Sequence, residues 1–460
     1  MAINKAAMPD IETDDIRQRH RLIFAIMLPA LAENLLSSLV SLADTAMVSV
    51  VGDAAISAVG LVTQPRFIVF SAFYALGTGA SALIARSKGK DDRREACTAL
   101  TQSVLMCLAI SLFMCLVMIF WAEGLIRFIA GANIAEDTIQ MALTYFRIQI
   151  WGFPSLGLTA IINGALRGTG NTRAAFTSNA VANVINVVLN YLLIAGNLGF
   201  PRMEVAGASL ATVIGQCAGL VVSLSIVCRK KEFLYIRLGG PMKPNGLMLK
   251  RIWRIGFPSL IEQVIMRVGI MAFTIIVTSL GDDPYTAHII AMNIQSLSFT
   301  TGMAFGTSSM TLTGQSLGRS RADLARWYTA RSNALGYIVS FLVAALLFFG
   351  GTFLAGLFTQ SLHIQMLAGG VLRIIALANP TSNARFVYNN ALRGAGDARF
   401  TAVNTFVGIL LIRPLVAALL VYVFPIGLTG VWIALISDAV ICFFLARIRW
   451  QRGKWALIQV

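Results

Sequence analysis

The chain has 460 residues, of which 57% are hydrophobic and 13% charged, and its formal net charge is +16. A soluble globular chain is typically about 25% charged, so this composition excludes a water-soluble enzyme, a disordered chain and a disulfide-rich secreted scaffold. It leaves a helical membrane protein, in which apolar residues occur in runs of about 20.

Twelve apolar runs, bounded by charged residues, glycine or proline, predict twelve transmembrane helices. Several runs exceed the ~20 residues that cross a bilayer, which predicts tilted helices or helices that extend into water. In chain order the runs lie at roughly 22–51, 55–85, 96–120, 137–165, 174–198, 205–228, 250–280, 284–314, 329–356, 365–392, 400–424 and 427–447.

Basic residues concentrate in alternate connections between these runs. Of the 37 Lys and Arg residues, 29 lie in the two tails and in the connections after even-numbered runs, whereas the connections after odd-numbered runs hold only Arg127 and Arg202. The positive-inside rule then predicts a multi-pass protein of the cell (inner) membrane with both termini in the cytoplasm. The same rule explains the net charge without nucleic acid as a partner.

The second half of the chain repeats the first. Two ungapped blocks align, with offsets of 229 and 226 residues, and each half contains six spans, so both halves have the same membrane orientation. This pattern predicts a parallel repeat with substrate sites between the halves. The aligned positions include Pro29 with Pro258, Glu33 with Glu262, and ALRGTGNTR (165–173) with ALRGAGDAR (391–399).

The predicted fold class is therefore an all-α polytopic membrane protein with two parallel six-helix lobes. The longest connection is basic and lies at the middle of the chain. We predict a cytoplasmic N-tail at 1–21, an N-lobe at 22–228, a cytoplasmic linker at 229–249, a C-lobe at 250–449 and a cytoplasmic C-tail at 450–460.

Polar residues form stripes on the first and fifth spans. A charge inside the bilayer costs about 2.5–3.5 kcal/mol or more, so charged residues within spans indicate functional sites. Glu33 and Asp44 lie eleven residues apart, close to three helical turns, and so share one face. The fifth span carries four asparagines at helical spacings of 4, 3 and 4, also on one face. They are Asn179, Asn183, Asn186 and Asn190.

Part of these stripes lies at one depth, in the outer half of the predicted membrane region. A carboxylate, two amides and a hydroxyl there predict a site for a proton or a hard cation such as Na⁺. The second half has apolar residues at the matching positions (Phe273, Ile412, Val416 and Leu435), so the fold alone does not require the polar set. The predicted cation or proton site is Asp44, Asn186, Asn190 and Thr212.

Other polar residues are secondary candidates, namely Glu33, Glu262, Asp438, Asn179 and Asn183. Pro29 and Pro258 each remove an amide donor and predict a helix bend. An alternative interpretation makes each glutamate a structural partner of the bent backbone or of a nearby Arg, and makes Asp438 a partner of Arg413 or Arg267.

Several motifs together resemble the MATE family (multidrug and toxic compound extrusion) over roughly 20–450. They are LADTAMVSVVG around Asp44, the paired ALRGxG turns, NxxxN in the fifth span and GASLAT in the sixth. The resemblance implies a secondary exporter that is not an enzyme and that exchanges H⁺ or Na⁺ for organic, often cationic, compounds by rocker-switch alternating access. It maps the cation site onto Asp44, Asn186, Asn190 and Thr212.

The same resemblance implies drug-like small molecules as substrates and membrane lipids as surroundings. We expect no cofactor, and we expect a monomer. The alternative function is a flippase for lipid-linked oligosaccharides from the same superfamily, which would need a cationic cavity. Four arginines inside spans support that alternative: Arg66, Arg267, Arg385 and Arg413.

Overall fold

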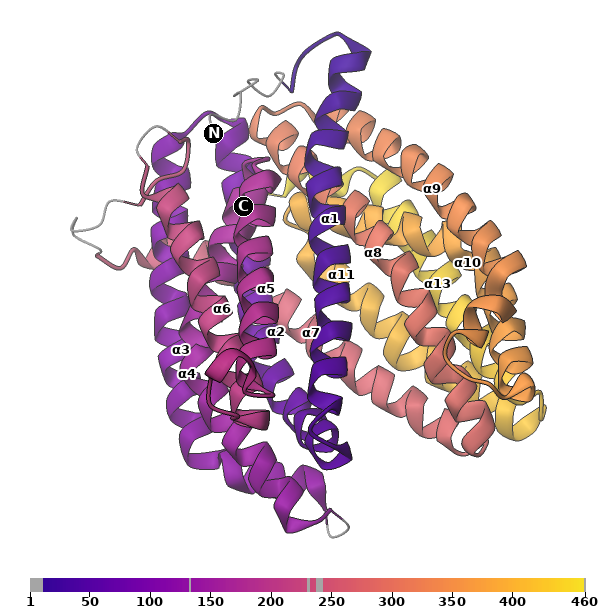
Figure 1. Cartoon of the computed structure of the whole chain (residues 1–460). Coiled ribbons are helices and arrows are strands. Elements are labelled where there is room, and N and C mark those ends of the chain that lie inside the picture. The colour runs from indigo at the N-terminus through magenta and orange to yellow at the C-terminus, as the bar shows by residue number, and fades with distance from the viewer. Residues whose placement is uncertain (1–10, 132–133, 230–231, 237–242, 459–460) are drawn as a thin grey trace. The chain divides into compact units, whose positions relative to one another are not determined.

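A computed structural model describes residues 11–131, 134–229, 232–236 and 243–458. Parts of the predicted N-tail, linker and C-tail therefore lie outside the described residues. The described chain is helical and contains no strand. Figure 1 shows the helices, whose bounds are α1 Ile16–Ser49, α2 Asp53–Gly89, α3 Arg93–Ala130, α4 Glu136–Gly168, α5 Thr172–Leu193, α6 Glu204–Val227, α7 Gly246–Thr278, α8 Asp282–Gly318, α9 Ala322–Gly356, α10 Leu362–Gly394, α11 Ala398–Thr405, α12 Arg413–Ala418 and α13 Leu428–Gln451.

The eleventh predicted span is one continuous helix with two π-helical stretches. Phe406–Ile412 joins α11 to α12, and Leu419–Val423 follows α12. Pro414 has no backbone N–H and so interrupts the α-helical ladder between them. When this composite helix is counted once, the described residues form twelve long helices, which confirms the predicted fold class.

Ten of these helices are long and apolar enough to cross a membrane. The other two are α4 and α8, whose hydropathy is lowered by polar residues buried between helices. In α8, for example, Ser309 donates to Thr329 of α9 at 3.3 Å, and Thr313 lies 3.1 Å from the same hydroxyl. Such bonds between spans are typical of helix packing in membranes.

The helices form two compact units. The first, here called the N-unit, contains Ala32–Gly256, and the second, the C-unit, contains the residues up to Leu31 together with Phe257 onward. Both boundaries fall inside long helices, within two residues of Pro29 in α1 and of Pro258 in α7. The two units divide within α1 and α7, whereas the predicted lobes divide in the connections between helices. The predicted lobe bounds therefore stay a prediction.

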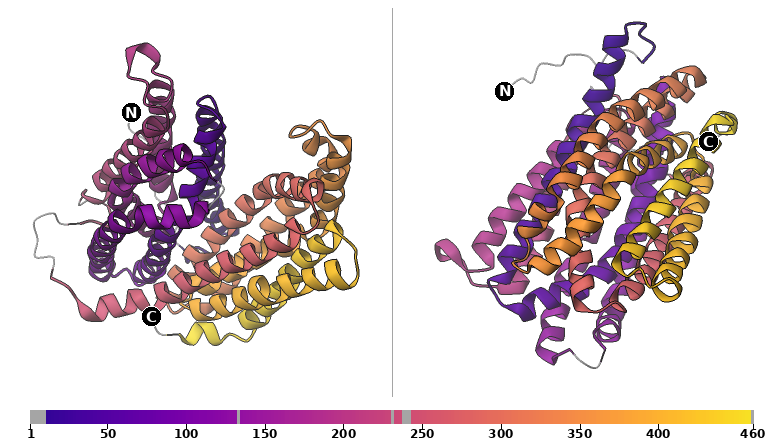
Figure 2. Two further views of the ribbon diagram at one scale, coloured as in Figure 1. Left: turned by 90° about the horizontal axis from the view of Figure 1, so that it is seen from below. Right: turned by 90° about the vertical axis from the view of Figure 1, so that its right-hand side faces the viewer.

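Each unit is built around one central helix. In the N-unit, α4 packs against α2, α3 and α6, and in the C-unit α10 packs against α8, α9 and α13. The orange and yellow helices of the C-unit run alongside one another in the views of Figure 2. Since α10 is the repeat counterpart of α4, the two units share one packing scheme.

The repeated ALRGxG motif is a helix-ending turn in both units. Gly170 and Gly396 have φ of 88° and 89°, the left-handed region that favours glycine. Asn171 N donates to Leu166 O at 2.9 Å, and Asp397 N donates to Leu392 O at 2.8 Å. These bonds close a Schellman-type turn between α4 and α5 and again between α10 and α11.

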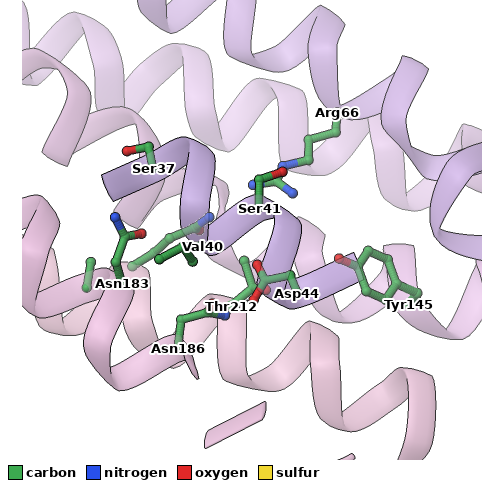
Figure 3. A pocket seen from close by; sticks show the side chains of 11 residues that line it. Ser37, Val40, Ser41, Asp44, Arg66, Tyr145, Asn183, Asn186 and Thr212 are labelled. Carbon is green, nitrogen blue, oxygen red and sulfur yellow. Dashed lines mark hydrogen bonds between the residues drawn. The ribbon is translucent and has the colours of Figure 1, made fainter. Parts of the chain in front are cut away.

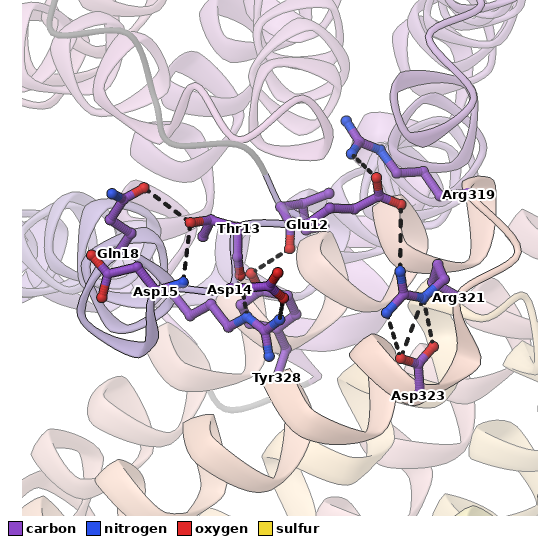
Figure 4. Close-up of polar contacts among 11 residues, drawn as sticks. Glu12, Thr13, Asp14, Asp15, Gln18, Arg319, Arg321, Asp323 and Tyr328 are labelled. Carbon is purple, nitrogen blue, oxygen red and sulfur yellow. Dashed lines mark hydrogen bonds and ion pairs between the residues drawn. The ribbon is translucent and has the colours of Figure 1, made fainter.

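The N-terminal segment before α1 packs onto the turn between α8 and α9, within the C-unit (Figure 4). Ile11 is only 6% exposed, and its carbonyl accepts a hydrogen bond from the Tyr328 hydroxyl at 2.8 Å. Glu12 pairs with Arg319 at 3.2 Å and lies 4.0 Å from Arg321. This segment therefore fixes the start of α1 to the C-unit by one buried side chain and by exposed ion pairs.

Candidate functional site

The N-unit contains a polar cavity of about 220 Å³ between α1, α2, α4, α5 and α6. Its walls contain one carboxylate and one guanidinium, and the remaining side chains are mostly neutral and polar. Figure 3 shows the Asn186 and Thr212 side chains beside Asp44. The lining residues are Ser37, Val40, Ser41, Asp44, Arg66, Tyr145, Ala182, Asn183, Asn186, Thr212 and Gln216.

Asp44 is the centre of the polar contacts. Asn190 Nδ2 donates to Asp44 Oδ1 at 2.7 Å. The Asn186 amide, oriented so that both of its ends have a partner, donates to Asp44 Oδ1 at 2.9 Å, and its oxygen lies 3.3 Å from Thr212 Oγ1. The structure therefore places the four residues of the predicted cation site together, on α1, α5 and α6.

One oxygen at this site has no partner among the described residues. Asn190 is 1% exposed, and its Oδ1 is buried without a hydrogen bond. An unsatisfied buried acceptor costs about 1–3 kcal/mol, and a bound cation would satisfy it. Together with the Asp44 carboxylate and the Thr212 hydroxyl, it supplies oxygen donors of the kind that hard cations prefer. Asn186 presents its N–H group to Asp44, so its amide must turn before its oxygen can join this set.

The polar cavity residues that were absent from the predicted site are Ser37, Ser41, Arg66, Tyr145 and Gln216. Arg66 brings a positive charge into the same cavity, while Tyr145 and Gln216 add a hydroxyl and an amide. Gln216 follows Thr212 by four residues on α6, so its position on the same helical face was readable from the sequence. Arg66 was named as a charge inside a span, but nothing in the sequence placed it beside Asp44, and a single Tyr in an apolar run gives no such indication.

The secondary candidates divide between the cavity and an ion pair. Asn183 lines the cavity, whereas Asn179 Nδ2 donates to Glu33 Oε1 at 2.5 Å. Arg167, from the ALRGTG turn, also pairs with Glu33 Oε1, at 3.0 Å. Glu33 thus lies beside the α4–α5 turn, outside the residues that line the cavity.

In the C-unit, the acidic candidates are both held by arginines. Glu262 pairs with Arg393 of the ALRGAG turn at 2.5 Å. Asp438 is fully buried and accepts from Arg385 at 2.8 Å and from Arg413. Arg413 was among the partners expected for Asp438, and Arg385 takes the place of the expected Arg267. These pairs favour the structural interpretation of Glu262 and Asp438.

Three of the four C-unit positions that match the predicted cation site lie in or against its apolar core. Phe273 and Leu435, the counterparts of Asp44 and Thr212, are each 3% exposed and pack in one hydrophobic cluster. Val416, the counterpart of Asn190, packs against the same cluster. The polar constellation around Asp44 is thus specific to the N-unit.

Comparison with known proteins identifies the family of the chain. The MatE family model matches residues 29–192 and 258–419, which begin at the two repeat-related prolines. A probable multidrug resistance protein NorM of Thermotoga maritima is 28% identical over 451 residues, covering 98% of this chain and 96% of that protein. The uncharacterized transporter YisQ of Bacillus subtilis is 25% identical, with 94% of each chain covered.

The fold also matches a solved structure. An outward-facing multidrug resistance MATE family transporter of the MOP superfamily superposes with a TM-score of 0.87 at 22% identity, covering 95% of this chain and 97% of that one. At this identity the likeness concerns the fold alone. Because the family match spans both repeats and most of the chain, the protein belongs to the MatE family of membrane transporters and is not an enzyme.

Proposed function

We propose that this transporter exports drug-like small molecules in exchange for a monovalent cation, H⁺ or Na⁺, bound at Asp44, Asn186, Asn190 and Thr212. The observation that carries the proposal is the Asp44 carboxylate in a polar cavity beside the unpartnered Asn190 oxygen. The printed names of the NorM relatives support multidrug compounds as substrates. The membrane is the cell (inner) membrane, with both termini in the cytoplasm.

The proposed mechanism is alternating access by a rocker-switch motion of the two lobes. Asp44 takes up the cation from outside, and this changes the bend of α1 at Pro29 and weakens substrate binding. Both unit boundaries lie at the prolines of α1 and α7, which supports these positions as the points where the helices bend. One charge that moves inward gains ~2.3 kcal/mol per 100 mV, equivalent to roughly fiftyfold accumulation.

The contacts of the C-unit arginines favour an exporter over a lipid-linked oligosaccharide flippase. A flippase would need a strongly cationic cavity. Arg385 and Arg413 instead share the buried Asp438 carboxylate, so half of the four intramembrane arginines that supported the flippase are engaged with an acid. In the cavity of the N-unit, the negative charge of Asp44 offsets the positive charge of Arg66.

The test is the efflux of a fluorescent organic cation from energised vesicles, with Na⁺ and pH gradients imposed separately. Wild-type export is expected to follow one of the two gradients and to fall to background in Asp44→Asn. The matched control is Asp283→Asn, which removes a carboxylate that is 59% exposed. If folded Asp44→Asn exported the dye at the wild-type rate, the cation site would be wrong. Wild-type protein that moves no dye under either gradient would overturn the exporter itself.

A further inference from the structure

The two units contain the same ion pair between repeat-related residues. Glu33 and Arg167 are 3.0 Å apart in the N-unit, and Glu262 and Arg393 are 2.5 Å apart in the C-unit. The helix after the turn adds a second donor to the same carboxylate oxygen. This donor is Asn179 for Glu33, at 2.5 Å, and Thr405 for Glu262, at 2.8 Å.

The two copies differ at the other carboxylate oxygen. In the C-unit, the Thr401 hydroxyl lies 3.3 Å from Glu262 Oε2 and 2.9 Å from Ala398 O, so Glu262 Oε2 has a hydroxyl within hydrogen-bond distance. The repeat counterpart of Thr401 is Ala175, which has no hydroxyl. Glu33 Oε2 is buried and has no partner among the described residues. Glu33 Oε2 therefore lacks the hydroxyl neighbour that Glu262 Oε2 has in the C-unit.

A chain of hydrogen bonds fixes the orientation of the Asn179 amide that faces Glu33. Ser223 donates to Asn163 Oδ1 at 2.9 Å, and Asn163 Nδ2 donates to Asn179 Oδ1 at 3.2 Å. The Asn179 amide must therefore present its N–H groups to Glu33. Glu33 Oε1 accepts from both Asn179 and Arg167, which leaves Oε2 as the oxygen that can take up a cation.

The Glu33 contact repeats the Asp44 contact along the same pair of helices. Asn179 and Glu33 are 146 residues apart in the sequence, and so are Asn190 and Asp44. Eleven residues separate the two contacts on each helix, which is about 16 Å along the helix axis. Ser37, Ser41 and Asn183 lie between the two levels and line the cavity.

We propose that Glu33 Oε2 is a second station for the coupling cation, used after Asp44 and before release at the α4–α5 turn. This inference rests on the proposed antiport. Arg167 is the charged side chain paired with Glu33 among the described residues, and its positive charge opposes a second cation, so occupancy of the station is brief. If the cation is a proton, it crosses the distance between the two levels by successive transfers among cavity water and the Ser41 and Ser37 hydroxyls. At each transfer the O–H bond of the donor breaks as one forms on the acceptor, and Glu33 finally releases the proton to the solvent.

The test separates cation binding from coupled transport in Glu33→Gln, with Glu262→Gln as the matched control that breaks the equivalent ion pair. In detergent, bound dye should be released by Na⁺ or acid from Glu33→Gln as from wild type, because Asp44 is intact. In proteoliposomes, its gradient-driven export per folded protein should fall at least tenfold below that of Glu262→Gln. Equal export by the two variants, or loss of the cation response in Glu33→Gln, would overturn the station.

Ala175→Ser is a second test variant, in which the ion pair between Glu33 and Arg167 stays intact. It adds to the N-unit the hydroxyl that Thr401 supplies in the C-unit, and it should slow export while the cation response of dye binding stays that of wild type. If Glu33→Gln does not fold, wild-type export by folded Ala175→Ser overturns the station. Failure of the antiport itself is recognised separately, because Asp44→Asn would then export normally or the wild type would not export at all.

Discussion

Asn190 donates a hydrogen bond to Asp44 at 2.7 Å and keeps its own amide oxygen buried without a partner. This geometry gives the amide two roles at once. Its N–H holds the carboxylate in place, and its oxygen is left for a ligand. In the other unit the matching residue is Val416, part of an apolar core, so the pairing belongs to one unit only.

If Na⁺ is the coupling ion, replacing Asn190 with Ala should weaken the binding of Na⁺. The change removes one buried oxygen of the proposed cation site, and the loss of one hydrogen bond or ligand to a charged group typically costs about 1.5–3 kcal/mol. We expect cation affinity to fall about ten- to hundredfold, since each 1.4 kcal/mol is tenfold. The measurement is the cation concentration that releases half of the bound dye from purified protein. An unchanged midpoint would show that Asn190 is not a ligand.

Na⁺ and H⁺ should compete at Asp44. A protonated carboxyl is neutral and attracts Na⁺ poorly, so if Na⁺ is the coupling ion its affinity should rise as the pH rises, until Asp44 is fully ionised. If H⁺ is the coupling ion, Na⁺ should not release bound dye at any pH. The measurement is dye release by Na⁺ across a pH series, with Asp44→Asn as the control in which any Na⁺ response should vanish.

Replacing Asp438 with Asn should destabilise the C-unit. Arg385 and Arg413 would lose their shared buried carboxylate, and breaking a buried ion pair in this way typically costs about 3–5 kcal/mol. We expect a clearly lower melting temperature in detergent. Asp44→Asn, at a half-buried position, is the comparison and should melt close to wild type. Equal melting temperatures for the two variants would contradict a structural role for Asp438.

Replacing Gly168 with Leu should prevent correct packing of α2 against α4. A Cβ at Gly168 would lie 2.6 Å from Ser81 O, so the helix backbones must separate. Overpacking of this kind costs about 1–3 kcal/mol or more. Less folded protein is expected by fluorescence-detected size exclusion. Gly60→Leu is the control, since a Cβ there meets no atom within 4 Å.

The sequence by itself determined the number of helices and the parallel repeat, and it singled out the four residues of the candidate cation site. Apolar runs report burial in lipid directly, and the repeat aligns without gaps over long blocks. The Asp44 set could be recognised because polar side chains inside a membrane are costly, and because the second half has apolar residues in their place.

Only the tertiary structure decided which charged residues pair. Pairing depends on contacts between helices far apart in the chain, which periodicity does not encode. The sequence left open which Arg would pair with each glutamate, and the structure pairs Arg167 and Arg393 of the ALRGxG turns with Glu33 and Glu262. The open oxygen of Glu33 follows from a single missing hydroxyl at Ala175, and its effect is visible only once α1, α4 and α5 are packed together.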